Sequence, residues 1–584
     1  MHAIRRAAGL DITPAQLDDG ADVDVMVVGA GMSGLYTAWR IMQDWRSSPR
    51  LKAMAARRPD GLLKVALLEY SDRVGGRLDS VILDEMDHVP AELGGMRFTA
   101  SHQLLNLLID KLDLRHDIEA FPMSNDSQFL LRSQRLDETS IDAGATVPYA
   151  LSPNELRQTP NQLFNYAITQ ICGDGATSWS DANWQWVKEN QRYSDDIYDN
   201  VALFDIGFWN VLYRVLSNEG FDFCWDGGGY NSNTINWNAA EAMPYMLTDF
   251  STTPTFSRFK TGFHTLPATL AKRVSALGCP IYRHSRLRRF ERSSTGISGL
   301  IERSDGHGPH ARFHAHALVL AMPRRSLELL DQDTDFFNAS AVQRNIQSVL
   351  PQPAYKLFMA YENRWWDKSL FYPGPTITDL QLRMTYDFGT QAERGGKPDD
   401  GRALLLAAYC DMQAASFWSV LERDKAWDRP PSWSQIGAKG GAPAPGTMTR
   451  MAETMLVQSL SVKGAPPPKP SKLLAAYYQD WSQDPYGAGF HAWAAHYKAW
   501  EIMRSVRQPL HDWPVYICGE AYSNAQGWVE GALCTAESML EDHFQLPRIA
   551  GLSPDYPLLT PVPVKPGDAE TSPTYLLRST PNAF

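Results

Sequence analysis

A short apolar run that ends in glycines, DVDVMVVGAG at residues 22–31, is the strongest structural signal in the sequence. Its β-branched residues predict a buried strand. Residues 32–45 then space their apolar side chains as a helix does, and residues 64–70 form a second apolar run. Strand, glycine turn, helix and second strand together predict a βαβ unit, which is typical of an α/β fold.

The turn after the first strand reads GAGMSG, residues 29–34, and fits the G-x-G-x-x-G pattern of dinucleotide-binding proteins. Gly29 permits the tight turn, and Gly31 lets backbone approach a pyrophosphate. Gly34 lets the helix pack closely on the strand. The helix N-terminus then faces the phosphates with its partial positive charge.

Two neighbouring features support a dinucleotide site. Glu69 ends the second strand, where a carboxylate can accept hydrogen bonds from ribose hydroxyls. It lies farther from the glycines than the usual ~20 residues because residues 46–63 form an insertion. A second glycine pair and Arg77 follow, which places a cation near the pyrophosphate. NAD-dependent dehydrogenases do not need this last element, so they are the weakest alternative.

The composition excludes several other classes of protein. The chain has 584 residues, of which 44% are apolar and 21% charged, as in globular proteins. The formal net charge of −11 argues against nucleic acid and anionic membranes as partners. The six cysteines are scattered without a CxxC pair, which argues against a zinc or disulfide framework. We see no secretory signal and no membrane-spanning run, and therefore expect a cytoplasmic protein.

Further motifs follow in a recognisable order. They are GAGMSG (29–34), EYSDRVGGR (69–77), ELGGMRF (92–98), SRLRRF (285–290), ALVLAMPRRSL (317–327), YKLFMAYENRWW (355–366) and GEAYSNAQGWVEGAL (519–533). In these motifs the sequence resembles the flavin-containing amine oxidase family, in its L-amino-acid oxidase branch. The resemblance covers residues 22–545, although the helical middle and residues 428–470 match poorly.

The resemblance implies a Rossmann-like FAD-binding domain interleaved with a mixed-sheet substrate domain and a helical domain. The expected ranges are 21–80, 260–345 and 505–550 for the FAD-binding domain, 81–145 and 350–500 for the substrate domain, 146–255 for the helical domain and 551–584 for a Pro-rich tail. The family also implies a homodimer. Its cofactor is FAD, which we expect to be non-covalent because DPYGAGFHAW, 484–493, lacks the cysteine that some relatives use.

The family's FAD contacts transfer to residues that match its motifs. They are Gly29, Gly31, Met32, Ser33, Gly34, Glu69, Tyr70, Gly76, Arg77, Gly94, Gly95, Met96, Arg97, Leu287, Glu520, Gly527, Trp528, Val529 and Ala532. The last block would also place a helix N-terminus beside the flavin, where its dipole stabilises negative charge on the reduced ring.

The resemblance also implies an amino-acid substrate, with O₂ as the second substrate. Arg97 would hold the substrate carboxylate with two parallel hydrogen bonds, supported by Tyr386. Gly527 would offer its carbonyl to the amine, and Trp528 would form one wall of an aromatic cage. Lys356 would lie near the flavin and assist O₂ reduction or imine hydrolysis, with its pKa lowered by burial.

The implied reaction is oxidative deamination of L-amino acids to 2-oxo acids, with release of ammonia and hydrogen peroxide. An amino-acid 2-monooxygenase, which forms an amide, needs the same carboxylate clamp and stays open. A polyamine or monoamine oxidase and a non-catalytic flavoprotein are further alternatives. Metal binding by the histidines of residues 307–316 is disfavoured, because an exposed loop and strand edge explains them.

Side-chain preference depends on the helical region near residues 225–245, which includes the glycine-rich break WDGGGYNSN at 225–233. The many aromatic residues of the chain favour a large apolar substrate side chain. Asp226 or Glu241 could instead serve a basic one.

Overall fold

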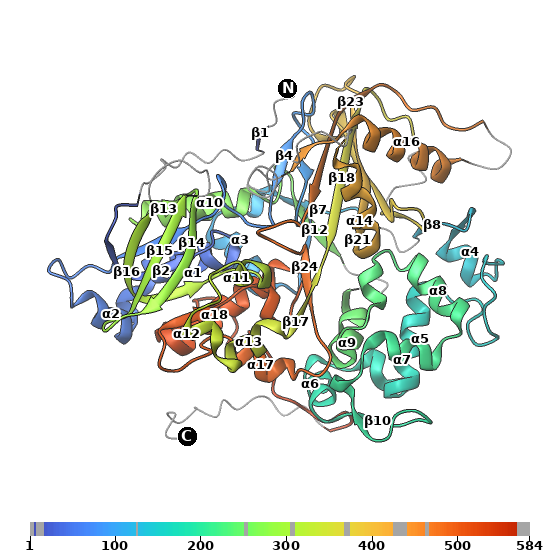
Figure 1. Ribbon diagram of the computed structural model, residues 1–584. Coiled ribbons are helices and arrows are strands. Elements are labelled where there is room, and N and C mark those ends of the chain that lie inside the picture. Colours follow the sequence, from blue (N-terminus) through green and yellow to red (C-terminus); the bar gives the residue numbers. More distant parts are fainter. Residues whose placement is uncertain are drawn as a thin grey trace.

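The computed structural model describes residues 5–6, 17–123, 127–249, 255–303, 310–366, 374–423, 441–461 and 466–568. Two large sheets and a group of helices make up the fold (Figure 1). The seven-stranded sheet lies on one side, with the eight-stranded sheet beside it. The helices of residues 160–249 gather below the second sheet in the same view.

The seven-stranded sheet contains the predicted βαβ unit. Its strands are β2 (Ala21–Val28), β3 (Val65–Leu68), β13 (Ile281–Tyr282), β14 (Ser285–Arg292), β15 (Ile297–Arg303), β16 (Ala311–Leu320) and β25 (Val515–Ile517). Strands β2 and β3 run parallel on either side of α1 (Met32–Asp44) in sequence, and β16 and β25 extend the parallel part. The antiparallel pair β15–β14 forms one edge. The α/β prediction with a Rossmann-like unit is confirmed.

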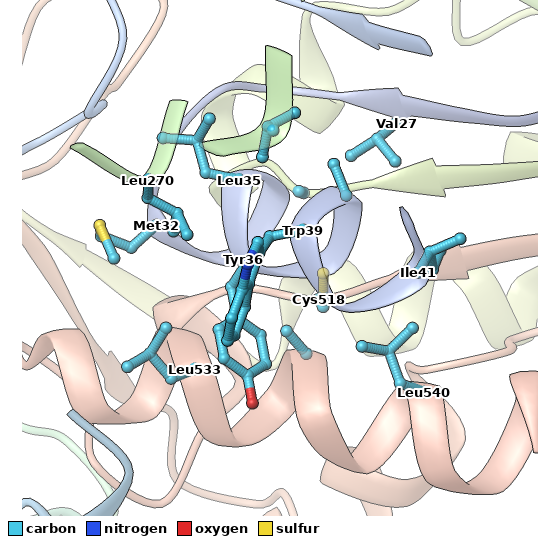
Figure 2. Packing of buried hydrophobic residues seen from close by; sticks show 14 of the residues in the cluster. Val27, Met32, Leu35, Tyr36, Trp39, Ile41, Leu270, Cys518, Leu533 and Leu540 are labelled. Atoms are coloured by element: carbon cyan, nitrogen blue, oxygen red, sulfur yellow. The ribbon is translucent and has the colours of Figure 1, made fainter. Parts of the chain in front are cut away.

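Helix α1 is buried between two other helices, α10 (Thr265–Ala276) and α18 (Val529–Phe544). Figure 2 shows Leu35 of α1 near Leu270 of α10, while Leu533 lies on the α18 side. Tyr36 extends toward α18, and its hydroxyl donates to Glu537 at 2.9 Å. This packing fixes the N-terminus of α1 against the sheet, because the helix contacts neighbours on both sides.

The eight-stranded sheet is the second layer. In spatial order its strands are β22 (Ala442–Pro443), β23 (Leu473–Asp480), β18 (Ala354–Tyr361), β21 (Ala403–Asp411), β20 (Met384–Thr390), β19 (Thr376–Thr378), β8 (Gln128–Leu131) and β9 (Gln134–Asp137). Every residue of β18 is buried, because the sheet is covered on both faces. On one face lie α14 (Met412–Ser419) and α16 (Gly446–Leu460).

Helix α16 lies within residues 428–470, which match the family motifs poorly. It is part of the core, because Met448, Ala452 and Leu456 are buried against the sheet beside Tyr355 and Tyr478. Residues 428–440 and 462–465 of that region lie outside the described residues.

The helical group lies between residues 138 and 249. Its helices are α4 (Glu138–Asp142), α5 (Pro160–Cys172), α6 (Asp181–Asn190), α7 (Phe208–Val215), α8 (Asn218–Gly227) and α9 (Ala239–Asp249). The short turn η5 (Asn231–Thr234) follows α8 at the predicted glycine-rich break. The described part of the tail, 551–568, contains no helix or strand and reaches α6, where the Val564 amide donates to Ala182 O at 3.0 Å.

Smaller elements join these layers. They are β1 (Arg5–Arg6), α2 (Pro49–Ala55), β4 (Ser80–Ile82), β5 (Ala91–Glu92), β6 (Phe98–Thr99), α3 (Gln103–Lys111), β7 (Ile118–Ala120), β10 (Arg192–Tyr193), β11 (Val201–Ala202), β12 (Phe256–Phe259), α11 (Arg324–Glu328), α12 (Asp335–Asn338), α13 (Ser340–Gln347), β17 (Val349–Gln352), β24 (Phe490–Trp493) and α17 (Ala499–Ser505). Among the described helices, none combines the length and apolar character needed to cross a bilayer. The division into three domains stays a prediction.

Candidate active site

A long cleft opens at the carboxyl ends of β2, β3, β16 and β25, with an empty volume of about 1370 Å³ that includes part open to solvent. In open α/β sheets this edge is where ligands bind. Fifteen of the predicted cofactor residues line the cleft: Gly29, Gly31, Met32, Ser33, Glu69, Tyr70, Gly76, Arg77, Gly95, Leu287, Glu520, Gly527, Trp528, Val529 and Ala532. The remaining four, Gly34, Gly94, Met96 and Arg97, are not part of its lining.

The glycine turn leaves backbone open toward the cleft. Gly29 has a φ of +102°, and a Cβ there would lie 2.5 Å from the Ala321 carbonyl oxygen. A Cβ on Gly34 would lie only 1.8 Å from the Gly29 oxygen, so Gly34 serves close helix packing. Gly31 has space, because the nearest atom to its Cβ position is the Gly76 Cα at 3.9 Å. The residues therefore fit a pyrophosphate at Gly31 and Gly76.

Glu69 lies at the end of β3 and is tied to the glycine turn. Its Oε2 accepts from the Ala30 amide at 2.8 Å, and its Oε1 accepts from the amide and hydroxyl of Ser71 at 2.8 and 2.7 Å. A carboxylate has about four acceptor positions, and three are taken, so one ribose hydroxyl can still donate to Glu69.

Glu520 follows β25 and forms a buried charge network. Its Oε2 lies 2.8 Å from Arg77 Nη2 and 3.0 Å from His491 Nδ1, while its Oε1 accepts from the Gly527 amide at 2.7 Å. Burial alone would raise the pKa of Glu520, but Arg77 and His491 lower it to about 2. The carboxylate is therefore charged and fully partnered. The sequence did not indicate His491, because a single histidine in a strand carries no motif.

Lys356 lies buried on β18. Its Nζ donates to the carbonyl oxygens of Gly94 at 2.5 Å and Glu92 at 3.0 Å, and lies 4.6 Å from the centre of the Tyr409 ring. Burial lowers the pKa of Lys356. The Glu92 carboxylate, on the same segment, accepts from Ser80 Oγ at 2.6 Å and the Phe263 amide at 2.9 Å, and burial raises its pKa. The segment that begins at Glu92 thus carries both an acid and the carbonyls that hold the lysine.

Arg97 is half-buried among aromatic and sulfur atoms. Its guanidinium lies 4.2 Å from the centre of the Phe256 ring and 5.6 Å from that of Phe121, and its Nη1 lies 3.3 Å from Met123 Sδ. No carboxylate in the described part of the chain forms an ion pair with it. Its positive charge is therefore uncompensated by the described residues.

Three tyrosines lie near the Arg97 guanidinium. Burial alone would lower the pKa of Arg97, but proximity to Tyr386, Tyr230 and Tyr409, with a hydrogen bond to Tyr386, raises it. Burial also raises the pKa of Tyr230, and raises the pKa of Tyr409 to about 12. Only Tyr386 was predicted; Tyr230 comes from the glycine-rich break, which the sequence marked as a segment but not as a residue.

Trp528 connects the cleft to this cluster. Its ring stacks on Phe256 with centroids 6.2 Å apart and contacts His102 at 4.8 Å, and burial lowers the pKa of His102 to about 4. The cleft and the Arg97 cluster thus share an aromatic wall of uncharged rings.

The two acids considered for a basic substrate are already engaged. Glu241 pairs with Lys188 at 2.5 Å, and Asp226 accepts from the Tyr149 hydroxyl at 2.8 Å. His314, from the histidine-rich segment, hydrogen-bonds Asp22 at 3.0 Å. Within the described ranges, no three His, Cys, Asp or Glu side chains form a possible metal site. His307 lies outside those ranges.

A mostly parallel sheet whose first turn is GAGMSG, opening onto a cleft of this size, defines a dinucleotide-binding protein. The model of one family, described as flavin containing amine oxidoreductase, matches residues 32–429. The chain belongs to this family, and it is therefore an oxidoreductase that uses a flavin. The resemblance read from the motifs is confirmed.

Individual relatives span most of the chain. Aplysianin-A of Aplysia kurodai is 25% identical over 550 residues, covering 90% of each chain. An L-amino-acid oxidase of Demansia vestigiata is 20% identical over 514 residues, covering 87% of this chain and 84% of its own. The structure of putrescine oxidase bound to putrescine covers 90% of this chain and 99% of its own, with a TM-score of 0.59 and 16% identity. At that identity the last likeness shows the fold alone.

Proposed function

We propose that this protein catalyses the FAD-dependent oxidative deamination of L-amino acids to 2-oxo acids, releasing ammonia and hydrogen peroxide. The observation that carries the proposal is Arg97, whose charge has no described carboxylate partner and is surrounded by neutral phenols. A half-buried charge among aromatic rings is stabilised by a counter-charge, and an amino-acid carboxylate supplies one. A simple amine does not. The similarity to a named L-amino-acid oxidase points to the same substrate class.

The cofactor would lie along the cleft, with its pyrophosphate at Gly31 and Gly76 and its ribose at Glu69. We infer FAD because this cleft fits a dinucleotide. We infer non-covalent binding because none of the six cysteines lines the cleft. The flavin supplies one chemistry, acceptance of a hydride equivalent from the substrate α-carbon and transfer of the electrons to O₂.

The chain's own residues would bind, orient and desolvate the substrate. Arg97 and Tyr386 would hold the carboxylate, and the Gly527 carbonyl would accept from the neutral amine. Trp528 would exclude water from the reacting carbon. Lys356, whose lowered pKa favours its neutral form, would move protons during O₂ reduction or imine hydrolysis. The cytoplasmic location and the homodimer stay predictions.

A peroxide assay tests the proposal. Wild-type protein is assayed with L-amino acids, a few D-forms and the amines made by decarboxylating the best substrates. We expect amino acids to react and their amines to react poorly. Faster oxidation of the amines would reassign the protein as a polyamine or monoamine oxidase, and an amide product would make it a 2-monooxygenase.

Arg97→Met sharpens the same assay. A hydrogen bond to a charged group contributes roughly 1.5–3 kcal/mol, so kcat/KM for amino acids should fall about 10- to 100-fold or more. The slow reaction with amines should not fall. An equal loss for both substrates would show that Arg97 supports the flavin site and not the carboxylate.

A further inference from the structure

Tyr230 lies on the loop between α8 and η5, where it reaches the Arg97 cluster from the helical region. Its ring meets the Tyr409 ring nearly at right angles, with centroids 5.3 Å apart, and the two hydroxyls are hydrogen-bonded. Gly229, just before it, has a φ of +79°, a conformation that glycine adopts without strain. The glycine-rich break thus turns the chain so that the Tyr230 side chain extends from the helical region toward Tyr409 on the eight-stranded sheet.

Both ends of this loop are anchored to the sheet. At one end, Arg383 Nη2 donates to the carbonyl oxygens of Trp225 and Asp226 at 2.7 and 3.1 Å, close to the C-terminus of α8. At the other end, Asp411 is fully buried, and its two oxygens accept from the Asn231 amide at 2.8 Å and the Ser232 amide at 3.1 Å. The Ser232 hydroxyl also donates to Asp411.

Asp411 and Tyr409 are two residues apart on β21. They therefore point to the same side of the strand. Asp411 binds the two amides that directly follow Tyr230, so it fixes the backbone from which the Tyr230 ring extends toward Tyr409. No described cation forms an ion pair with Asp411, and its partners are the amides and hydroxyl of this one loop.

Tyr409 contacts two functional groups with different parts of one side chain. It lies opposite Lys356 in the β18–β21 pairing, and the face of its ring lies 4.6 Å from Lys356 Nζ. Its hydroxyl end meets Tyr230 near Arg97. Since burial raises the pKa of both phenols, each stays neutral near pH 7. The hydrogen bond between them uses one of their two hydrogens, and the other can be donated to a ligand. Phenol donors near a guanidinium that has no carboxylate partner among the described residues suit an incoming carboxylate, which accepts several hydrogen bonds.

We propose that Tyr230 and Tyr409 complete the carboxylate-binding site with Arg97, that their hydroxyls determine the preference for amino acids over amines, and that Asp411 is the positioning residue that fixes Tyr230. This inference rests on the proposed amino-acid oxidase function. It joins a loop of the helical region to a strand of the eight-stranded sheet in one specificity element.

The hydroxyls are tested with Tyr230→Phe and Tyr409→Phe in the flavin-loaded protein. Each removes one donor and keeps the ring, so Tyr409→Phe leaves the ring over Lys356. We expect kcat/KM for the best amino acid to fall about tenfold in each variant while the value for the matching amine is unchanged. Tyr213→Phe is the matched control, because the Tyr213 side chain is exposed on α7, and it should change neither value. A parallel loss for amino acid and amine, or an unchanged ratio, would overturn the inference.

Asp411 is tested with Asp411→Asn, alone and combined with Tyr230→Phe. An amide cannot accept on both of its ends, so one loop contact is lost and the ratio of amino-acid to amine kcat/KM should fall. If Asp411 acts through Tyr230, the double variant should show no larger loss of ratio than Tyr230→Phe alone. Additive losses would reject the positioning role.

Glu155→Gln is the matched control for Asp411→Asn. Glu155 accepts from the amide and hydroxyl of Ser217, both at 2.6 Å, and so anchors the other end of α8 in the same way. We expect it to lower stability without moving the ratio. The ratio of amino-acid to amine kcat/KM in the wild type distinguishes failure of the proposed function from failure of this inference. If the wild type preferred amines, the proposed function would be wrong. If the wild type preferred amino acids and both phenylalanine variants kept that preference, only this inference would be wrong.

Discussion

Two arginines only twenty positions apart along the chain, Arg77 and Arg97, occupy opposite electrostatic situations. Arg77 lies 2.8 Å from Glu520, inside a network that the protein completes by itself. Arg97 has no carboxylate partner in the ranges that the structure describes, and its neighbours are phenols, a thioether and two phenyl rings. A charge that is already paired stabilises the fold around the cleft. One without a partner favours the binding of an anion.

The two regions also differ in how they are assembled. The cleft takes its glycines and acids from short motifs that each carry a recognisable pattern. The Arg97 cluster takes Arg97, Tyr230, Tyr386 and Tyr409 from four distant segments. Changes in the cleft should therefore affect folding and flavin binding, and changes at Arg97 should affect substrates.

The largest expected effect is that of Gly34→Ala. Its Cβ would lie 1.8 Å from the Gly29 backbone oxygen, so α1 cannot keep its place on β2, and we expect little folded protein. Gly31→Ala is the matched control, because its Cβ has 3.9 Å of space and the protein should fold but bind flavin poorly. Thermal unfolding and visible flavin absorbance measure both outcomes. If Gly31→Ala kept its full flavin content, the pyrophosphate would not bind at this turn.

A second, smaller effect is expected for Glu520→Gln. A pKa lowered from 4.5 to about 2 corresponds to about 3 kcal/mol of stability from the charged form. Because the folded-state pKa is depressed, this stability is present above the unfolded pKa, near 4.5, and is lost as the pH falls toward 2. Denaturant unfolding at a series of pH values should show wild type and variant converging in that range.

Glu530→Gln is the control, because the stability that Glu530 contributes should change with pH in the opposite direction. Glu530 accepts from the amides of Leu104 and Leu105 at 2.8 and 2.7 Å, and burial raises its pKa. Its protonated form therefore contributes stability at low pH that is lost as the pH rises through the raised pKa. If the stability difference from wild type changed in the same direction with pH for both variants, the assignment of Glu520 as a charged, paired carboxylate would be wrong.

The smallest effect tests the charge of Arg97, which has no carboxylate partner within the described ranges. Benzoate, a carboxylate without an amine, should raise the unfolding temperature of the flavin-loaded wild type. At one hundred times its Kd it would add about 2.7 kcal/mol of stability. Benzylamine should stabilise less, and Arg97→Met should lose the benzoate response. A response that survives in Arg97→Met would place the anion elsewhere.

The sequence predicted more of the residues that line the cleft than of the residues that form the Arg97 cluster. Gly29, Gly31, Glu69 and Arg77 are recognisable because backbone approach to a phosphate restricts the residue type at fixed spacing. The sequence did not indicate His491, although it completes the Glu520 network, because the sequence alone does not distinguish it from any other histidine in a strand. Tyr230, Tyr409, Glu92 and Asp411 were missed for the same reason.

By itself the sequence determined the α/β fold, the dinucleotide turn and the family, since these depend on local periodicity and on glycines that no other residue can replace. It also marked Arg97 and Lys356 through motifs. Only the tertiary structure decided what surrounds them: that Glu241 and Asp226 are engaged, that Arg97 faces phenols, and that Asp411 fixes Tyr230. The physical reason is that partners and burial are set by segments far apart along the chain, and no local pattern records which of them meet.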